Sequence, residues 1–352
     1  MNPPFRKAMI LAAGLGTRLQ PVTESTPKPL VPVLNIPNLV HNIHLLKNFG
    51  VESIIINTYH LPEQLERYLG NGTRWGVKIS YSRETKLLGT GGGVKKAERF
   101  FEGEPFVLMN CDFVAQLDLR RMAEQHLSRK ALATMVLFSD DSRQRFYSEV
   151  GVDETGHLCA LPSFSSQKPK RTGIFTGIHF LDPSLLAFLK EEPCGINEIL
   201  YPKLMREFPG RVYAEFIEGG YWYDTGNIAY FCETSLSLLA RLRAGDTALT
   251  ELLQKELGYV QPWKGIWTAK GTTLPKDTKL AAPVVIGANC KIGSKTQLGP
   301  NVVLGNDTLV PAGTRLSHVI GLDRARFSGE EIAGRNGAIQ FGEKTLPATV
   351  TQ

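Results

Sequence analysis

"LAAGLGTRLQPVTESTPKPLVPV", residues 11–33, follows a short apolar run and contains two glycines, two cations and four prolines. Gly14 and Gly16 permit a tight turn whose backbone can approach a ligand closely. The prolines exclude a continuous helix and keep the later part extended. The pattern predicts a strand, a backbone-lined turn and a stiff strap that presents Arg18 and Lys28 to a polyphosphate. A glycine-rich surface turn with two solvated cations is the alternative.

Two common phosphate-binding loops do not match this segment. The Walker loop ends in Gly-Lys-Ser/Thr, whereas Gly16 is followed by Thr17 and Arg18. The dinucleotide-binding loop requires a third glycine or an alanine where this chain has Leu19.

The order Gly-x-Gly-Thr-Arg, then Pro, Thr and Pro-Lys-Pro, resembles the signature of the sugar-1-phosphate nucleotidyltransferases, also called NDP-sugar pyrophosphorylases. The resemblance implies that Arg18 meets the triphosphate and that Lys28 meets the phosphates near the reacting phosphorus. It also implies that the turn holds the nucleotide through Leu11, Ala12, Ala13, Gly14, Gly16 and Thr17.

Composition indicates an ordinary globular chain. It has 352 residues, 42% of them hydrophobic and 21% charged, and a net charge of +6 that suits small anionic substrates. A basic block of the kind that nucleic-acid-binding proteins carry is missing, and so is an apolar run of about 18 residues that could span a membrane. The first ten residues lack the apolar region of a signal peptide. Five scattered cysteines predict free thiols in a reducing cytoplasm.

Strand-like and helical segments alternate through the first two thirds of the chain. This alternation predicts an α/β domain at residues 1–245, built on a doubly wound, mostly parallel sheet. A linker is expected at residues 246–262. The role of a tail at 327–352, rich in glycine and polar residues, is left open by the sequence.

An aliphatic residue recurs every six positions from Leu274 to Leu316. This period fits neither a helix nor a simple strand and is typical of the hexapeptide repeat of a left-handed parallel β-helix, here expected at residues 263–326. A short coil stack leaves open apolar faces, so we expect a homo-oligomer.

Two aspartates stand out as metal ligands. Asp112 ends the apolar strand "PFVLMNCD", and Asp224 lies in "GGYWYDTG". Mg²⁺ favours one or two carboxylates together with phosphate oxygens and water. The family resemblance implies that Asp112 and Asp224 bind Mg²⁺; a helix cap or loop acid for Asp112 and an Asx turn for Asp224 are the alternatives.

The motif "LLGTGGGVKKA" at residues 87–97 places three glycines before a helical pattern. The resemblance places Thr90, Gly91 and Asn110 near the nucleotide and Glu84 at the base edge; a flexible helix start is the plain alternative. A carboxylate can accept from two adjacent N–H groups of guanine, which favours GTP. "TGGG", however, looks more like the muramate-phosphate uridylyltransferases, so the base stays open.

The sugar site has looser matches. The resemblance assigns sugar binding to Thr176 and Gly177 of "FTGIHFL" and to Asn197 and Glu198 of "INEILYPKL". Glu198 fits equally well as an acid in the first turn of a helix.

Together these features resemble the mannose-1-phosphate guanylyltransferase group, which also carries a C-terminal β-helix. The resemblance implies transfer of a nucleotidyl group from an NTP to a sugar 1-phosphate, for polysaccharide or cell-wall precursors. The alternatives are a uridylyltransferase acting on a sugar such as N-acetylmuramate, a regulatory subunit that binds nucleotide sugars, an acyl-transferring β-helix and a purely structural hexapeptide module. Arg18, Lys28, Asp112 and Asp224 are all present, which favours catalysis.

Overall fold

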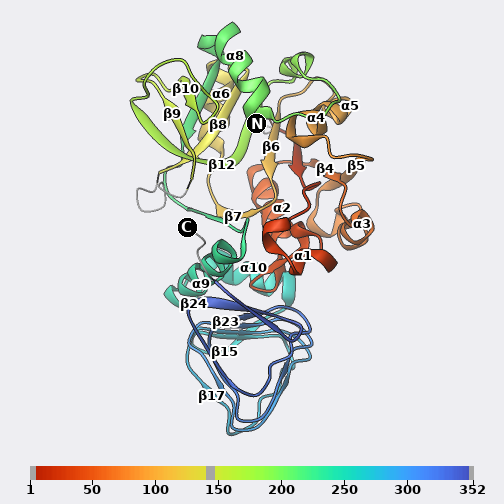
Figure 1. Ribbon diagram of the computed structural model, residues 1–352, viewed down its shortest axis with the longest axis vertical. Coiled ribbons are helices and arrows are strands. Elements are labelled where there is room, and N and C mark those ends of the chain that lie inside the picture. Colours follow the sequence, from red (N-terminus) through yellow and green to blue (C-terminus); the bar gives the residue numbers. More distant parts are fainter. Residues whose placement is uncertain (1–4, 140–146, 349–352) are drawn as a thin grey trace. The chain divides into compact units, whose positions relative to one another are not determined.

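A computed structural model describes residues 5–139 and 147–348. They form two compact units that interleave along the sequence, coloured by residue number in Figure 1. The first unit contains the chain up to Leu15, Thr26–Pro29 and His41–Trp222. The second contains Gly16–Ser25, Leu30–Val40 and the chain from Tyr223 onward. Residues 11–33 therefore contribute to both units.

A ten-stranded mixed sheet forms the centre of the first unit, with β11-β10-β9-β12-β6-β1-β4-β5 as its main strand order. Four neighbouring strands are parallel: β5 (Lys78–Arg83), β4 (Ser53–Thr58), β1 (Lys7–Leu11) and β6 (Phe106–Asn110). The long strand β12 (Arg171–Leu181) runs antiparallel to β6, β8 (Ala133–Phe138) and β9 (Glu149–Val152). β10 (Leu158–Leu161), β11 (Phe164–Ser165) and β13 (Val212–Phe216) complete the sheet, whereas β7 (Phe113–Gln116) lies outside it. The predicted doubly wound α/β fold is confirmed, with an antiparallel half.

The helices of this unit follow the predicted segments. α2 (Asn38–Phe49), whose first three residues belong to the second unit, buries Leu39, Ile43 and Leu46 completely, since their spacing places them on one helical face. The segment predicted as one helix after the glycines is divided at Ala97 into two helices, and the first begins at Gly89 and so includes the three glycines. The helices are α3 (Pro62–Leu69), α4 (Gly89–Lys96), α5 (Glu98–Phe101), α6 (Arg120–Ser128) and α8 (Tyr201–Glu207), with a π-helical turn at Ile196–Leu200.

The second unit contains a parallel β-helix. Each coil advances by 18 residues, since Ile266 pairs with Val284, Val284 with Val302, and Leu280 with Leu298. Three predicted hexads thus make one coil. The strands are β16 (Ile266–Thr268), β17 (Lys279–Leu280), β18 (Val284–Ile286), β19 (Lys291–Ile292), β20 (Gln297–Leu298), β21 (Val302–Leu304), β22 (Leu309–Val310) and β23 (Arg315–Gly321).

One wall of the β-helix is buried on both faces. Ile286 and Leu304 point into the coil, and Val285 and Val303 are also buried on the opposite side of the wall. On that wall α9 (Ile228–Ala244) packs against β23 and the two strands of the tail, β24 (Glu331–Phe341) and β25 (Lys344–Pro347).

The tail and the linker are more ordered than the sequence indicated. β24 extends the wall parallel to β23, and β25 returns antiparallel to β24. These two strands thereby cover the edge of the last coil. The predicted linker contains α10 (Thr247–Leu257) and β15 (Val260–Trp263). The smaller elements of this unit are α1 (Val22–Ser25), β2 (Pro32–Val33) and β3 (Ile36–Pro37), and β14 (Tyr221–Asp224) leads into it. The domain boundaries stay predictions.

Candidate active site

Three neighbouring strands of the first unit end at the same level. Leu11, the last residue of β1, lies in register with Asn57 of β4 on one side and with Asn110 of β6 on the other. Ligands of open α/β sheets bind outside the carboxyl ends of such strands. The chain turns that follow these three residues therefore meet at one edge.

A pocket of about 310 Å³ opens at this edge. Most predicted nucleotide-binding residues of the first unit meet in it. The lining residues are Leu11, Ala13, Gly14, Lys28, Asn57, Glu84, Leu87, Gly89, Thr90, Asn110, Cys111 and Asp112.

Lys28 and Asp112 form an ion pair inside the pocket. Lys28 Nζ donates to Asp112 Oδ2 at 2.7 Å, and the two side chains are 11% and 26% exposed. The strap thus brings its lysine onto the carboxylate that follows β6. Burial raises the pKa of the neighbouring Cys111 thiol to about 12, so this thiol stays protonated and serves as a packing group rather than a nucleophile.

Asn57 is a pocket residue that sequence reasoning missed. Its Oδ1 accepts from the Ala12 N–H at 2.8 Å, and its Nδ2 donates to Glu84 Oε1 at 2.8 Å. The other Glu84 oxygen accepts from the Leu88 N–H at 2.9 Å. Asn57 and Glu84 are 2% and 7% exposed. Glu84 therefore fixes the chain before α4 in addition to facing the pocket, and a polar residue ending the apolar strand "SIIIN" was the signal available.

The glycines of the TGGG motif pack against a distant segment. A Cβ at Gly91 would lie 2.7 Å from Cys194 Sγ, and one at Gly92 would collide with the Glu192 carbonyl. The Gly91 N–H donates to Cys194 O at 2.9 Å, and Thr90 Oγ1 accepts from the Ile196 N–H at 2.7 Å. Close helix packing therefore occupies Gly91, whereas Thr90 lines the pocket.

The predicted sugar-binding residues occupy different environments. Thr176 is 1% exposed and its hydroxyl donates to Val136 O at 2.9 Å, so its side chain belongs to the sheet. Gly177, with φ +84, lies against the Asn110 side chain and leaves no room for a Cβ. Asn197 presents a buried Oδ1 without a partner among the described residues, and Glu198 folds over Gly195.

The remaining predicted residues belong to the second unit. Gly16 has φ +67, and the Thr17–Leu19 turn that follows it carries Arg18. Asp224 Oδ1 accepts from the Gly226 N–H at 2.5 Å, as the Asx-turn alternative predicted. A Cβ at Gly226 would lie 2.8 Å from Asp224 Oδ1 and 3.2 Å from Arg18 Nη2. Arg18 and Asp224 therefore approach the same glycine.

The donor chemistry of the two aspartates fits Mg²⁺. Carboxylate oxygens are hard ligands, and each Asp112 oxygen can accept more than the one bond from Lys28. Among the described residues there is no group of three or more His, Cys, Asp or Glu side chains that could hold a metal. A complete protein cage is not needed, because Mg²⁺ usually takes part of its shell from phosphate and water.

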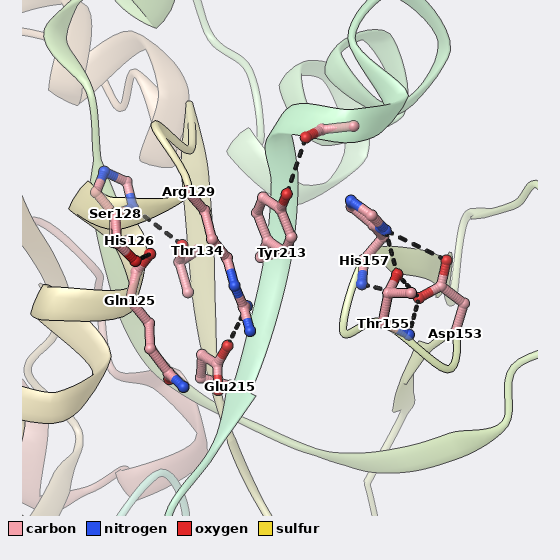
Figure 2. Close-up of polar contacts among 11 residues, drawn as sticks. Gln125, His126, Ser128, Arg129, Thr134, Asp153, Thr155, His157, Tyr213 and Glu215 are labelled. Atoms are coloured by element: carbon pink, nitrogen blue, oxygen red, sulfur yellow. Dashed lines mark hydrogen bonds and ion pairs between the residues drawn. The ribbon is translucent and has the colours of Figure 1, made fainter.

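A second polar cluster of the first unit lies outside the pocket lining (Figure 2). His126 Nδ1 contacts Thr134 Oγ1 at 2.9 Å, Arg129 pairs with Glu215, and His157 shares hydrogen bonds with Asp153 and Thr155. His157 also packs against the Tyr213 ring at 4.5 Å between centroids. These contacts join β8, β13 and the β9–β10 turn. We therefore interpret the cluster as one that stabilises the sheet.

The geometry of turn, strap and sheet edge agrees with a sequence comparison. The profile of the family described as "Nucleotidyl transferase" matches residues 7–241. The chain belongs to the nucleotidyl transferase family. A second profile, described as "Bacterial transferase hexapeptide (six repeats)", matches residues 270–318.

The described residues contain no helix with the length and hydropathy needed to cross a membrane, and the five cysteines are free as predicted.

Relatives of this chain differ in the base and the sugar that their descriptions give. A UTP–glucose-1-phosphate uridylyltransferase of Synechocystis is 31% identical over 67% of this chain and 64% of its own length. Mannose-1-phosphate guanylyltransferase 1 of Arabidopsis thaliana is 33% identical over 62% of this chain and 61% of its own length. A structure described as a glucose-1-phosphate thymidylyltransferase of Bacillus anthracis is 25% identical, with a TM-score of 0.56, and covers 67% of this chain and 95% of its own. The chain thus spans less than two thirds of the two curated relatives.

Proposed function

We propose that this nucleotidyl transferase family member converts an NTP and a sugar 1-phosphate into an NDP-sugar and pyrophosphate. The observation that carries the proposal is the Lys28–Asp112 pair in a pocket at the carboxyl edge of the parallel strands. Phosphoryl and nucleotidyl transfers depend mainly on positioning and on neutralising charge, which a cation on a stiff strap can do.

The proposed chemistry needs no covalent intermediate. A phosphate oxygen of the sugar 1-phosphate attacks the α-phosphorus, the bond to the β-phosphate oxygen breaks, and pyrophosphate leaves with the electron pair. The nucleophile is already ionised, so a general base is not required. Lys28 would neutralise charge at the α-phosphorus, and Arg18 would neutralise the departing pyrophosphate.

Asp112 and Asp224 would hold Mg²⁺, which supplies charge neutralisation at the phosphate oxygens. Lys28 Nζ, already within 2.7 Å of Asp112 Oδ2, would orient that carboxylate. The Asp224 Oδ1 contact with the Gly226 N–H would orient the second carboxylate.

GTP is the base that we propose first. The guanylyltransferase of Arabidopsis is similar to this chain, and the Glu84 carboxylate faces the pocket with acceptor capacity beyond its two contacts. Guanine offers two adjacent N–H donors to such a group. UTP is the alternative, since the uridylyltransferase of Synechocystis is about equally similar.

A substrate panel tests this function. Pyrophosphate release would be measured for each NTP with mannose, heptose, glucose and N-acetylmuramate 1-phosphates. We expect turnover with one base strongly preferred, and loss of turnover in Lys28→Met, which keeps the apolar stem. Lys47→Met, on α2 outside the pocket lining, is the matched control. Turnover with none of the pairs would refute the proposal.

We further propose that the protein acts in the reducing cytoplasm as a homo-oligomer. The support for assembly is the open first coil: Trp263 and Val260 of β15 are 57% and 46% exposed beside a cavity of about 510 Å³ lined by Leu274, Leu280 and Ala282. Large exposed apolar patches mark association sites. Trp263→Glu, or truncation near Pro262, should lower the mass measured by light scattering. A monomeric wild type would refute assembly.

A further inference from the structure

The second unit contains two buried asparagines on one short segment, of which the first bonds to the β-helix and the second to the residue after Asp224. Asn35 Nδ2 donates to Leu304 O of β21 at 2.8 Å and to the Tyr259 hydroxyl at 2.9 Å. Three residues later, Asn38 Nδ2 donates to Thr225 Oγ1 at 2.6 Å. Thr225 directly follows Asp224.

These groups are taken out of water. Asn35 and Asn38 are 6% and 2% exposed, and their partners Tyr259 and Thr225 are 3% and 2% exposed. A buried polar group that loses its partner keeps its full desolvation cost, so such bonds hold both ends firmly. Burial also raises the pKa of Tyr259, which keeps its hydroxyl protonated.

The hairpin that carries Asn35 is itself strained. Leu34 and Asn35 form the two-residue turn between β2 and β3 with φ +49 and +66. Asparagine tolerates this left-handed region, but leucine does not. Leu34 is nevertheless completely buried. Strained turns that the surrounding structure holds in place are common at sites where the exact position of a residue matters for function.

Asp224 is fixed from the helical side as well. The Thr234 hydroxyl of α9 donates to Asp224 O at 2.6 Å. In α9, Cys232 and Leu236 lie against Gly337 of β24, where a Cβ would come within 3.2 Å of Cys232. Both supports of Asp224, the hairpin and α9, thus rest on the same wall of the β-helix.

We infer that the β-helix is a part of the catalytic framework, in which Asn35 and Asn38 are positioning residues: Asn35 fixes the hairpin on the β-helix, and Asn38 holds the Thr225 hydroxyl and hence the adjoining Asp224. This inference rests on the proposed function, since it concerns a carboxylate assigned there to the metal. The hexapeptide repeats then have a task inside each chain, separate from any role in assembly.

The test compares Asn35→Gly with Asn289→Gly. Glycine suits φ +66, so Asn35→Gly removes the two side-chain bonds without new backbone strain. Asn289 has φ +57 and is an exposed asparagine of the β-helix in the same unit, which makes it the matched control. Asn38→Ala is the second variant, at the other end of the segment.

Two readouts separate positioning from stability. Hydrogen–deuterium exchange would be measured on peptides covering residues 221–230, and Mn²⁺ affinity by electron paramagnetic resonance with GTP or UTP present. We expect faster exchange and roughly tenfold weaker Mn²⁺ binding in Asn35→Gly and Asn38→Ala, with wild-type values in Asn289→Gly. In the turnover assay kcat should fall about tenfold, with the KM for sugar 1-phosphate unchanged.

Wild-type exchange and Mn²⁺ affinity in both variants, even with a lower melting temperature, would overturn the inference, because the bonds would then serve stability alone. A wild type without turnover for any substrate pair would instead refute the proposed function. Exchange at residues 221–230 would still report whether Asn35 and Asn38 hold this segment.

Discussion

The pocket of the first unit and the β-helix of the second use their sequences in opposite ways. In the β-helix one aliphatic side chain repeats every six residues, and neighbours such as Leu298 and Leu304 do the same packing task in successive hexads. In the pocket, Lys28 and Asp112 form an ion pair across 84 positions of the sequence, and neither belongs to a repeat. The difference teaches that packing is distributed over many equivalent positions, whereas chemistry is concentrated in a few.

Removal of the divalent cation is expected to abolish the activity of the pocket and to leave the β-helix folded. EDTA should abolish turnover without a change in the melting temperature larger than a few degrees. Asp112→Asn and Asp224→Asn should each raise the Mg²⁺ concentration for half-maximal rate. The double variant should lose less than the product of the single losses, because both residues would serve one ion. Activity in EDTA, or multiplicative losses, would contradict a shared metal.

Loss of either cationic side chain, Lys28 or Arg18, should have the next largest effect on turnover. Lys28→Ala or Arg18→Ala should lower kcat by roughly a hundredfold or more, the scale of removing one preorganised charge contact. Thermal unfolding should change little, because both side chains lie outside the apolar core. Steady-state kinetics and calorimetry measure the two effects, and a near-normal kcat in either variant would exclude the assigned role.

A β-helix substitution should show the reverse behaviour. Leu298 is 1% exposed in the coil interior. Leu298→Ala should destabilise the second unit by about 2–5 kcal/mol, the usual cost of such a cavity. NTP affinity of the pocket, measured by calorimetry well below the melting temperature, should stay at the wild-type value. Equal losses of stability and affinity would mean that the coil interior around Leu298 is coupled to the pocket, in addition to the β21 and β24 contacts that support Asp224.

The smallest expected effect is a pH dependence that belongs to the first unit. Burial lowers the pKa of His126 to about 4 and that of His179 to about 3. Both would take up a proton near pH 6.5 in the unfolded chain. Their folded pKa values are depressed, so stability is full above pH 6.5 and falls as the pH drops toward 4. Each should contribute roughly 1–2 kcal/mol of loss between pH 7 and 5.

Urea unfolding at the two pH values measures this loss. His126→Gln should remove about half of the pH dependence, since its ring contacts Thr134 as Figure 2 shows. The β-helix interior contributes no histidine to this effect among its described core residues. An unchanged slope in the variant would contradict the assignment.

Local patterns in the sequence predicted the elements and most of the pocket. The apolar runs of β1, β4 and β6, the helical spacing of Leu39, Ile43 and Leu46, and the six-residue period are short-range properties that physical chemistry converts directly into strands, helices and coils. The glycines and prolines of residues 11–33 likewise fix a turn and a strap by their own backbone preferences.

Only the tertiary structure decided which distant side chains share a hydrogen bond. Asn57 and Ala12 are 45 residues apart, Thr90 and Ile196 are 106 apart, and Asn35 and Leu304 are 269 apart. Such pairs carry no local periodicity, and each partner alone fits an ordinary turn or strand end. The packing of complete elements selects them, because the fold must satisfy every buried donor and acceptor at once. For this reason the TGGG glycines serve as a packing surface, and the β-helix is connected to the segment that contains Asp224.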